Sequence, residues 1–224
     1  MARINTVQKS RKEKVCGRCG KTIPVGSKYF YIDFYSGRTA VRCENCGFKK
    51  SETTENYYLQ QVYGLQENYE ERLHNSTGED LEDIKSELVD ELETLKDECQ
   101  ERFDNIPEQL QDGDAGQLLQ ERIDSLDGVI SDVDSTDVQD FEDWREDNGY
   151  GEEDFESWCE ENGYADDDSE DDYDDEDEEY EDYGHSSLED HRDEFDTEAT
   201  DKYKEEYLDD KVEEILGYLE NIAE

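Results

Sequence analysis

The stretch Cys16-Gly-Arg-Cys19-Gly20 has the same C-x-x-C-G pattern as the later stretch Cys43-Glu-Asn-Cys46-Gly47. Two thiols in a C-x-x-C pair can ligate one metal ion, and the glycine after each pair lets the backbone turn tightly around it. The sequence therefore predicts one structural zinc ion bound by Cys16, Cys19, Cys43 and Cys46, in a closed site because the protein fills all four positions. The alternative, four unliganded thiols, would leave this short segment with little to fold around.

The segment between the two cysteine pairs predicts a β-hairpin. Residues 28–35 (Lys-Tyr-Phe-Tyr-Ile-Asp-Phe-Tyr) are aromatic and β-branched, and residues 39–42 form a shorter strand candidate. Ser36-Gly37 between them is a turn signal. The zinc-binding β-hairpin module is accordingly placed at residues 15–50.

The charge of the chain is divided unevenly. The whole chain has 22 Lys and Arg against 69 Asp and Glu, a formal net charge of −47. Residues 1–50 nevertheless hold twelve of the basic residues and only three of the acidic ones. A basic N-terminal module is thus followed by a strongly acidic body, and the two attract each other unless salt or a partner intervenes.

The setting is expected to be intracellular. No run of 18 apolar residues occurs, and the first ten residues lack the apolar segment of a secretory signal, so no membrane contact is expected. A reducing compartment favours thiolate–zinc bonds over disulfides.

The body is expected to be helical. From Ser51, a candidate N-cap, apolar residues recur at helical spacing, and interruptions at residues 75–78 and 105–116 separate three stripes. The stripes are Tyr58, Val62, Leu65, Tyr69 and Leu73; Leu81, Ile84, Leu88, Leu92, Leu95 and Cys99; and Leu119, Ile123, Leu126, Ile130 and Val133. Short connections between such stripes predict antiparallel neighbours, a helical hairpin or bundle over residues 51–135.

A short repeat with a period of 14 follows at residues 136–165. Residues 140–150 (Asp-Phe-Glu-Asp-Trp-Arg-Glu-Asp-Asn-Gly-Tyr) match residues 154–164 at eight positions of eleven. Each copy predicts a short amphipathic helix ended by a left-handed Asn or Gly. The aromatic residues of the repeat either pack back on the central helices, the favoured interpretation, or contact a partner protein. The candidate partner contacts are Phe141, Trp144, Phe155 and Trp158.

The remaining segments complete the predicted organisation. Residues 1–14 are a loose basic arm, residues 166–187 a disordered acidic low-complexity linker, and residues 188–224 contain a C-terminal helix that begins near Thr200. The fold class is therefore α+β: a small zinc-held hairpin module followed by a mostly α-helical acidic body. The oligomeric state is left open.

The module resembles a zinc ribbon or treble clef, with a knuckle, a hairpin, a second knuckle and then a helix over roughly residues 15–73. This resemblance implies zinc binding by the four paired cysteines. The opening Ala-Arg-Ile-Asn-Thr-Val, followed by a basic stretch and Cys-Gly-Arg-Cys-Gly, is also similar to zinc-binding proteins encoded by tailed viruses of bacteria and archaea. That similarity implies a viral origin, hence a host cytoplasm or a virion, and supplies no activity.

The basic module has two interpretations. In the first, its cations neutralise nucleic-acid phosphates while the hairpin aromatics stack on bases. In the second, the aromatics form the module's own core and the cations balance the negative charge of the acidic body. The candidate nucleic-acid contacts are Arg11, Lys12, Lys14, Lys28, Arg38, Lys49 and Lys50.

Nothing in the sequence indicates catalysis. No phosphate-binding glycine loop, H-E-x-x-H motif or nucleophile motif occurs. The first hypothesis is therefore a non-enzymatic interaction protein whose basic zinc module contacts nucleic acid or a nucleic-acid-associated protein, while its acidic helices contact protein. The alternatives are an acidic decoy that imitates DNA and a structural or assembly component of a virion. High-salt adaptation would also explain the acidity.

Overall fold

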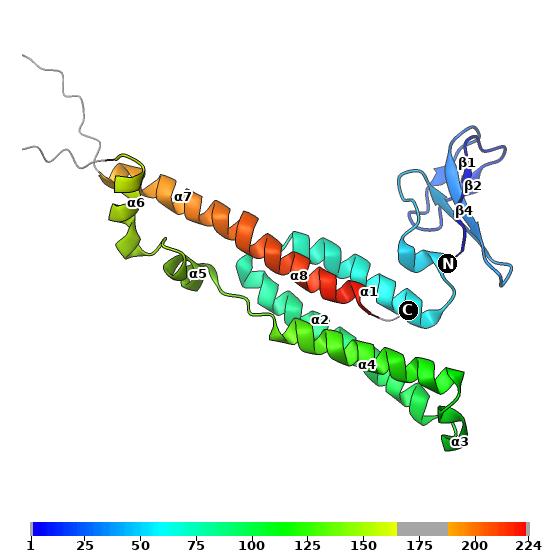
Figure 1. The fold of residues 1–224 in the computed structure, drawn as a ribbon. Helices are drawn as coiled ribbons and strands as arrows, with labels where there is room; N and C mark the ends of the chain where they lie inside the picture. The colour runs from blue at the N-terminus through cyan, green and yellow to red at the C-terminus, as the bar shows by residue number, and fades with distance from the viewer. Residues whose placement is uncertain (1, 165–187, 223–224) are drawn as a thin grey trace, which may run out of the picture. The chain divides into compact units, whose positions relative to one another are not determined.

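The computed structural model describes residues 2–164 and 188–222, which belong to two compact units (Figure 1). The first unit comprises residues 1–75, 84–136 and 214–224, and the second comprises residues 76–83 and 137–213. The predicted fold class is confirmed, because a small antiparallel sheet precedes a mostly helical body. The predicted acidic linker, residues 166–187, lies outside the described residues.

The predicted hairpin forms the centre of the N-terminal sheet. Strand β4 (Tyr29–Asp33) pairs antiparallel with β5 (Thr39–Cys43). Gly37 in the turn has a φ of 85°, a left-handed conformation that glycine adopts without strain. The register places Tyr29 opposite Cys43, so the end of the hairpin carries the first cysteine of the second pair.

The sequence predicts a loose arm over residues 1–14, and this prediction is wrong for part of its length. Asn5–Val7 form β1, which pairs with the outer edge of β4 and gives a three-stranded sheet of order β1-β4-β5. Lys14–Val15 form β2, which pairs with β3 (Thr22–Ile23). The cause is backbone pairing: an edge strand needs partners for its N–H and C=O groups, whatever its side chains are. The module therefore extends beyond the predicted residues 15–50.

The first helix begins later than predicted. Lys50–Thr53 form a short 3-10 turn, η1, and helix α1 (Tyr57–His74) starts after Asn56, whose side chain accepts a hydrogen bond from the Leu59 N–H. The predicted N-cap, Ser51, instead lies in η1 and donates its hydroxyl to Glu67. The predicted apolar stripe of α1 is buried at every position.

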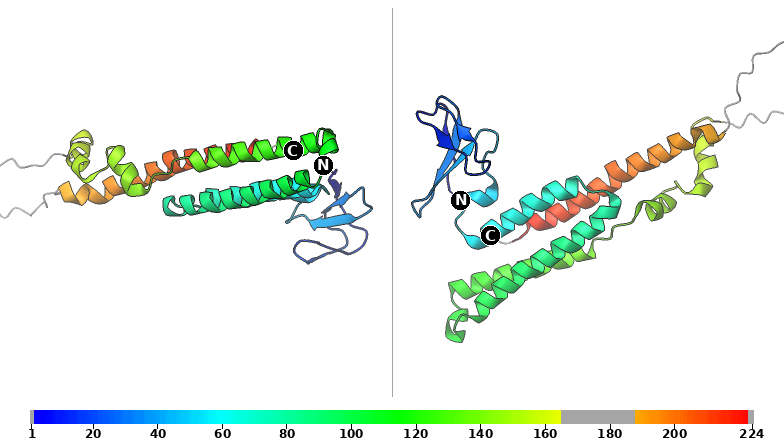
Figure 2. Two further views of the ribbon diagram at one scale, coloured as in Figure 1. Left: turned by 90° about the horizontal axis from the view of Figure 1, so that it is seen from below. Right: turned by 180° about the vertical axis from the view of Figure 1, so that it is seen from behind.

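Helices α1 and α2 (Gly78–Asp104) are antiparallel neighbours in the first unit (Figure 2). Arg72 near the end of α1 pairs with Glu87 near the start of α2, at 2.5 Å. At the opposite end, the guanidinium of Arg102 lies 5.0 Å from the centre of the Tyr57 ring. All six residues of the second predicted stripe are buried.

Helix α4 (Asp114–Ser135) and the end of α8 (Asp209–Glu220) complete this bundle. A short helix, α3 (Glu108–Gln111), connects α2 to α4. Lys96 of α2 pairs with Asp127 of α4 at 3.0 Å, and Gln66 of α1 donates to the Leu219 carbonyl of α8 at 2.8 Å. The end of the final helix thus packs on the central helices. Leu119 is half-buried, and the other four residues of the third stripe are buried.

The second unit contains the repeat and a long helix. The two copies form α5 (Phe141–Asp147) and α6 (Phe155–Glu161), separated by the 3-10 turn η2 (Glu152–Asp154). Gly149 and Gly163 follow them with φ of 79° and 81°, which confirms the predicted left-handed stops. After the 3-10 turn η3 (Leu188–His191), helix α7 (Arg192–Lys202) begins before the predicted start at Thr200.

Helix α7 continues into α8 through a π-helical segment, η4 (Tyr203–Leu208), in which the Asp209 N–H donates to the Lys204 carbonyl. The buried residues of this continuous helix lie four, four, five, four, three and four positions apart. They are Phe195, Ala199, Tyr203, Leu208, Val212, Ile215 and Leu219. The interval of five lies at the π-helical segment, where one extra residue in the turn keeps Tyr203 and Leu208 on the same buried face.

Within the described ranges, none of the helices is both long and apolar enough to cross a membrane.

Candidate metal centre

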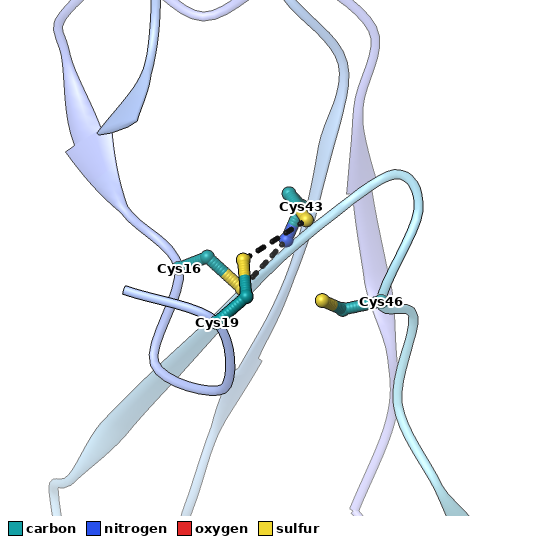
Figure 3. Close-up of side chains that lie close together, drawn as sticks. All are labelled: Cys16, Cys19, Cys43 and Cys46. Atoms are coloured by element: carbon teal, nitrogen blue, oxygen red, sulfur yellow. Dashed lines mark hydrogen bonds between the residues drawn. The ribbon is translucent and has the colours of Figure 1, made fainter. Parts of the chain in front are cut away.

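The first cysteine pair lies in a tight turn directly after β2. The Cys16 N–H donates to the Lys21 carbonyl at 3.0 Å, and the Gly20 N–H donates back to the Cys16 carbonyl at 2.9 Å. Gly20 has a φ of 69°, so a side chain at this position would strain the turn. The turn directs the thiols of Cys16 and Cys19 to the same side (Figure 3).

The second pair repeats this geometry at the end of β5. The N–H groups of Cys46 and Gly47 both donate to the Cys43 carbonyl, at 3.2 and 3.1 Å, and Gly47 has a φ of 57°. The two turns face each other, with the Cys43 N–H 3.4 Å from the Cys16 sulfur.

The four thiols converge on one point (Figure 3). Their sulfur atoms all lie within 4.8 Å of one another, and those of Cys19 and Cys43 are 3.8 Å apart. Four sulfurs at the usual zinc–sulfur bond length in a tetrahedron are about 3.8 Å apart. None of these four cysteines forms a disulfide bond. The cluster can therefore hold a metal ion, and its donor set and dimensions fit zinc.

The electrostatics of the thiols depend on their neighbours. Burial raises the pKa of Cys16, but the backbone N–H groups of Cys19, Cys43 and Arg18 outweigh it and lower that pKa to about 6. Hydrogen bonds with the thiols of Cys43 and Cys19 raise the pKa of Cys46 to about 12. Because a thiol must lose its proton to bind a metal ion, ion binding to this cluster releases protons.

The cluster is partly accessible. Cys16 is 1% exposed, Cys43 and Cys46 are half-buried, and Cys19 is exposed. Among the described residues, no second group of three or more His, Cys, Asp or Glu side chains converges in this way.

The predicted nucleic-acid contacts fall into two groups. Arg11, Lys12 and Lys14 are exposed, and none of them forms an ion pair within the part of the chain that the structure describes. They lie in the segment that leads into β2. At the start of this segment the Ser10 N–H donates a hydrogen bond to the Ser27 carbonyl at 2.9 Å.

The other four predicted contacts are more dispersed. Lys28 pairs with Glu44 at 2.9 Å. Arg38 lies over the Phe34 ring at 4.8 Å, and the Lys50 ammonium lies over the Tyr63 ring at 3.9 Å. Lys49 is exposed. Arg11, Lys12 and Lys14 thus form one group of neighbouring exposed cations before the first cysteine pair, and Arg38, Lys49 and Lys50 are exposed elsewhere.

The four aromatic residues predicted as partner contacts pack inside the second unit. In each repeat the Phe and the Trp flank one ring of the long helix, Tyr203 for the first copy and Phe195 for the second, with centroids 5.3 Å and 5.4 Å away. Trp144 and Phe155 are buried, at 6% and 4% exposure. The repeat faces inward within the second unit, onto α7 and η4.

Sequence reasoning missed the carboxylate that joins the two copies. Glu198 of α7 accepts hydrogen bonds from the Tyr150 hydroxyl at 2.8 Å and from the Trp158 indole N–H at 2.9 Å. The sequence did offer one indication of this contact. Phe195 and Tyr203 lie eight residues apart, about two turns of helix, so each copy of the repeat can pack against one of these rings, with Glu198 between them.

Sequence reasoning also missed two arginines beside the cysteine turns, Arg18 and Arg42, which both pair with Glu52.

Comparison of the chain with protein-family models, curated proteins and solved structures found no match.

Proposed function

We propose that this chain is a non-enzymatic zinc-binding interaction protein. In this proposal Cys16, Cys19, Cys43 and Cys46 bind one structural zinc ion, which gives the basic sheet its shape. All four coordination positions are filled by protein, which supports a structural role over a catalytic one. Reduced thiolates also fit an intracellular setting, including the cytoplasm of a host cell if the protein is viral.

We further propose that the basic module contacts nucleic acid. The observation that carries this proposal is the group of exposed cations Arg11, Lys12 and Lys14, held beside the metal cluster in a chain of net charge −47. In so acidic a chain, a group of cations without acidic partners is expected to bind a polyanion. The acidic helical body would then contact a second protein.

The proposal is tested with the zinc-loaded full chain and a labelled single-stranded oligonucleotide at several salt concentrations. Binding through phosphate contacts gives an affinity that falls steeply with salt, and replacing Arg11, Lys12 and Lys14 by Ala is expected to reduce the slope by about 2.

A matched variant replaces Lys96, Arg102 and Lys204 by Ala. It removes the same number of cations from the helical body and is expected to keep the affinity and slope of the unmodified chain. Binding that does not respond to salt, or equal losses in the two variants, would contradict nucleic-acid contact by the basic module.

A second candidate function is an acidic decoy of a DNA-binding protein. Helix α2 supports it, because its exposed carboxylates form ordered rows on a rigid element, as imitation of phosphate spacing requires. The exposed acidic residues of α2 include Glu82, Asp83, Glu87, Asp90, Glu91, Glu93, Asp97, Glu101 and Asp104. A decoy would displace duplex DNA from a non-specific DNA-binding protein and would not bind the oligonucleotide itself.

A further inference from the structure

Arg18 links the two cysteine turns to each other. It lies inside the first C-x-x-C pair, and its Nη1 donates to the Cys46 carbonyl of the second pair at 2.8 Å. Its Nη2 lies 2.5 Å from Glu52 Oε2. One guanidinium thus joins the first turn, the second turn and η1.

Arg42 reaches the same carboxylate from the sheet. It directly precedes Cys43 in β5, and its Nη2 and Nε lie 2.6 and 3.1 Å from Glu52 Oε1. Its side chain crosses the first turn at Gly17, where an added Cβ would lie 2.5 Å from Arg42 Nη1. Gly17 is therefore required for the guanidinium to lie in this position.

Glu52 is held by several neighbours at once. Its side chain is 24% exposed, that of Arg42 is 13% exposed, and Glu52 Oε2 also accepts the Lys49 N–H at 3.1 Å. Burial raises the pKa of Glu52, but its hydrogen bonds with Arg42 and Arg18 outweigh this and lower it. The carboxylate is therefore charged at neutral pH and accepts hydrogen bonds from both arginines.

The residues next to Glu52 fix η1 to other parts of the first unit. Ser51 donates both its N–H and its hydroxyl to Glu67 of α1, at 3.1 and 2.6 Å. The Thr53 carbonyl accepts the Ala2 N–H at 2.7 Å, next to β1. Glu52 is thus held in place by both α1 and the N-terminal strand segment.

We propose that Glu52 is a positioning residue for the zinc site: by binding Arg18 and Arg42 together, it holds the two cysteine turns at the separation that four zinc-bound sulfurs require. Its role is geometric, because the charge of Glu52 alone would oppose the negative charge that four thiolates leave on a zinc complex. The two arginines supply the favourable charge, and Glu52 sets where they lie.

This inference rests on the zinc-binding part of the proposed function. The test measures how fast the zinc-loaded full chain transfers zinc to an excess of a chromophoric chelator. Outer-shell partners of metal ligands typically contribute 10- to 100-fold in metal affinity, so Glu52→Gln is expected to release zinc at least 10-fold faster than the unmodified chain.

The matched control is Glu44→Gln. Glu44 also lies beside the ligands, inside the second C-x-x-C pair, and pairs with Lys28 at 2.9 Å, but it is exposed and contacts neither arginine. Its variant is expected to release zinc within twofold of the unmodified rate. Arg42→Lys keeps the charge and loses the planar fork of donors, so it is expected to behave as Glu52→Gln does.

The outcomes separate the explanations. Equal rates for Glu52→Gln and Glu44→Gln would overturn the positioning role, and slower release from Glu52→Gln would show that charge alone governs the site. A Glu52→Gln chain that cannot be loaded with zinc supports the role only if Arg42→Lys loads and releases zinc faster. An unmodified chain that binds no zinc would refute the metal site itself.

Discussion

The ammonium group of Lys85 donates a hydrogen bond to the Thr136 carbonyl over 2.9 Å, and both residues are buried. Lys85 lies on α2, and Thr136 is the C-cap of α4. The last carbonyls of a helix have no partner within that helix and carry its partial negative charge. The Lys85 ammonium therefore provides the C-terminal end of α4 with a hydrogen-bond donor and a positive charge.

Replacing Lys85 by Met is expected to reduce the free energy of unfolding by about 1.5–3 kcal/mol, since the aliphatic stem is kept while a charged donor to a buried carbonyl is lost. Urea unfolding followed by far-ultraviolet circular dichroism measures the change. Lys96→Met, which breaks the exposed pair with Asp127, is the control and is expected to change stability by less than about 1 kcal/mol. Similar values for the two variants would contradict a special role for Lys85.

Two helical glycines are expected to respond oppositely to Ala. A Cβ on Gly64, inside α1, meets nothing within 4 Å, so Gly64→Ala should stabilise the chain by up to about 1 kcal/mol. A Cβ on Gly78, at the start of α2, would lie 2.1 Å from the Tyr203 hydroxyl and 2.8 Å from its ring. Tyr203 is 4% exposed and cannot move aside, so Gly78→Ala should destabilise the chain. Thermal unfolding of the two variants measures whether the first is more stable and the second less stable than the unmodified chain.

Metal content is expected to depend on the paired cysteines alone. Elemental analysis of the purified chain should give one zinc per molecule, and Cys43→Ser should lose it, because a structural site rarely tolerates the loss of a thiolate. Cys99 and Cys159 are buried in the helical parts, so Cys99→Ser and Cys159→Ser are controls that should retain the metal. Loss of zinc from either control would place a ligand outside the cluster.

The environment of the two tryptophans is expected to depend on the charge of Glu198. Hydrogen bonds from Tyr150, Lys202 and Trp158, which outweigh burial, lower the pKa of this carboxyl. A lowered pKa adds stability above the ordinary glutamate pKa of about 4.3, and that stability is lost as the pH falls through the folded value. Because Glu198 is more than a third exposed, Glu198→Gln is expected to remove about 1 kcal/mol at pH 7.

Near-ultraviolet dichroism at pH 3–7 reads this effect, since both tryptophans belong to the second unit. The difference between Glu198→Gln and the unmodified chain should shrink below about pH 4. The exposed Glu156→Gln is the control and should follow the unmodified chain throughout. A difference that does not shrink at all as the pH falls from 7 to 3 would mean that the charge of Glu198 is not its cause.

The apolar pattern of the chain was enough to predict the central helices α1, α2 and α4. The stripes from Tyr58 to Leu73 and from Leu81 to Cys99 are buried as their spacing requires, because side-chain burial at that period is what stabilises an amphipathic helix. The cysteine cluster was equally predictable, since C-x-x-C spacing and the following glycines are local properties of the chain.

Features that depend on backbone pairing or on distant residues were not predictable. β1 has only three residues, Asn5, Thr6 and Val7, too short a run to give a strand signal in the sequence, and it forms because β4 offers a free edge. Glu52 joins Arg18 and Arg42 across the fold, and nothing in the spacing of these three residues indicates that they meet. The repeat was predicted to pack inward, but α7, the helix against which it packs, was missed. The sequence of α7 is too polar to show a clear apolar stripe.

The π-helical segment Tyr203–Leu208 gives the chain a position that should accept a change in length. Deleting the exposed Glu205 would shorten the interval of five between Tyr203 and Leu208 to four, so that an ordinary α-helix would keep both residues buried. A deletion elsewhere in the same helix would rotate every later residue by about 100°, turning Ile215 and Leu219 away from their neighbours. Circular dichroism and thermal unfolding should therefore find the deletion of Glu205 tolerated and the deletion of Glu213 disruptive.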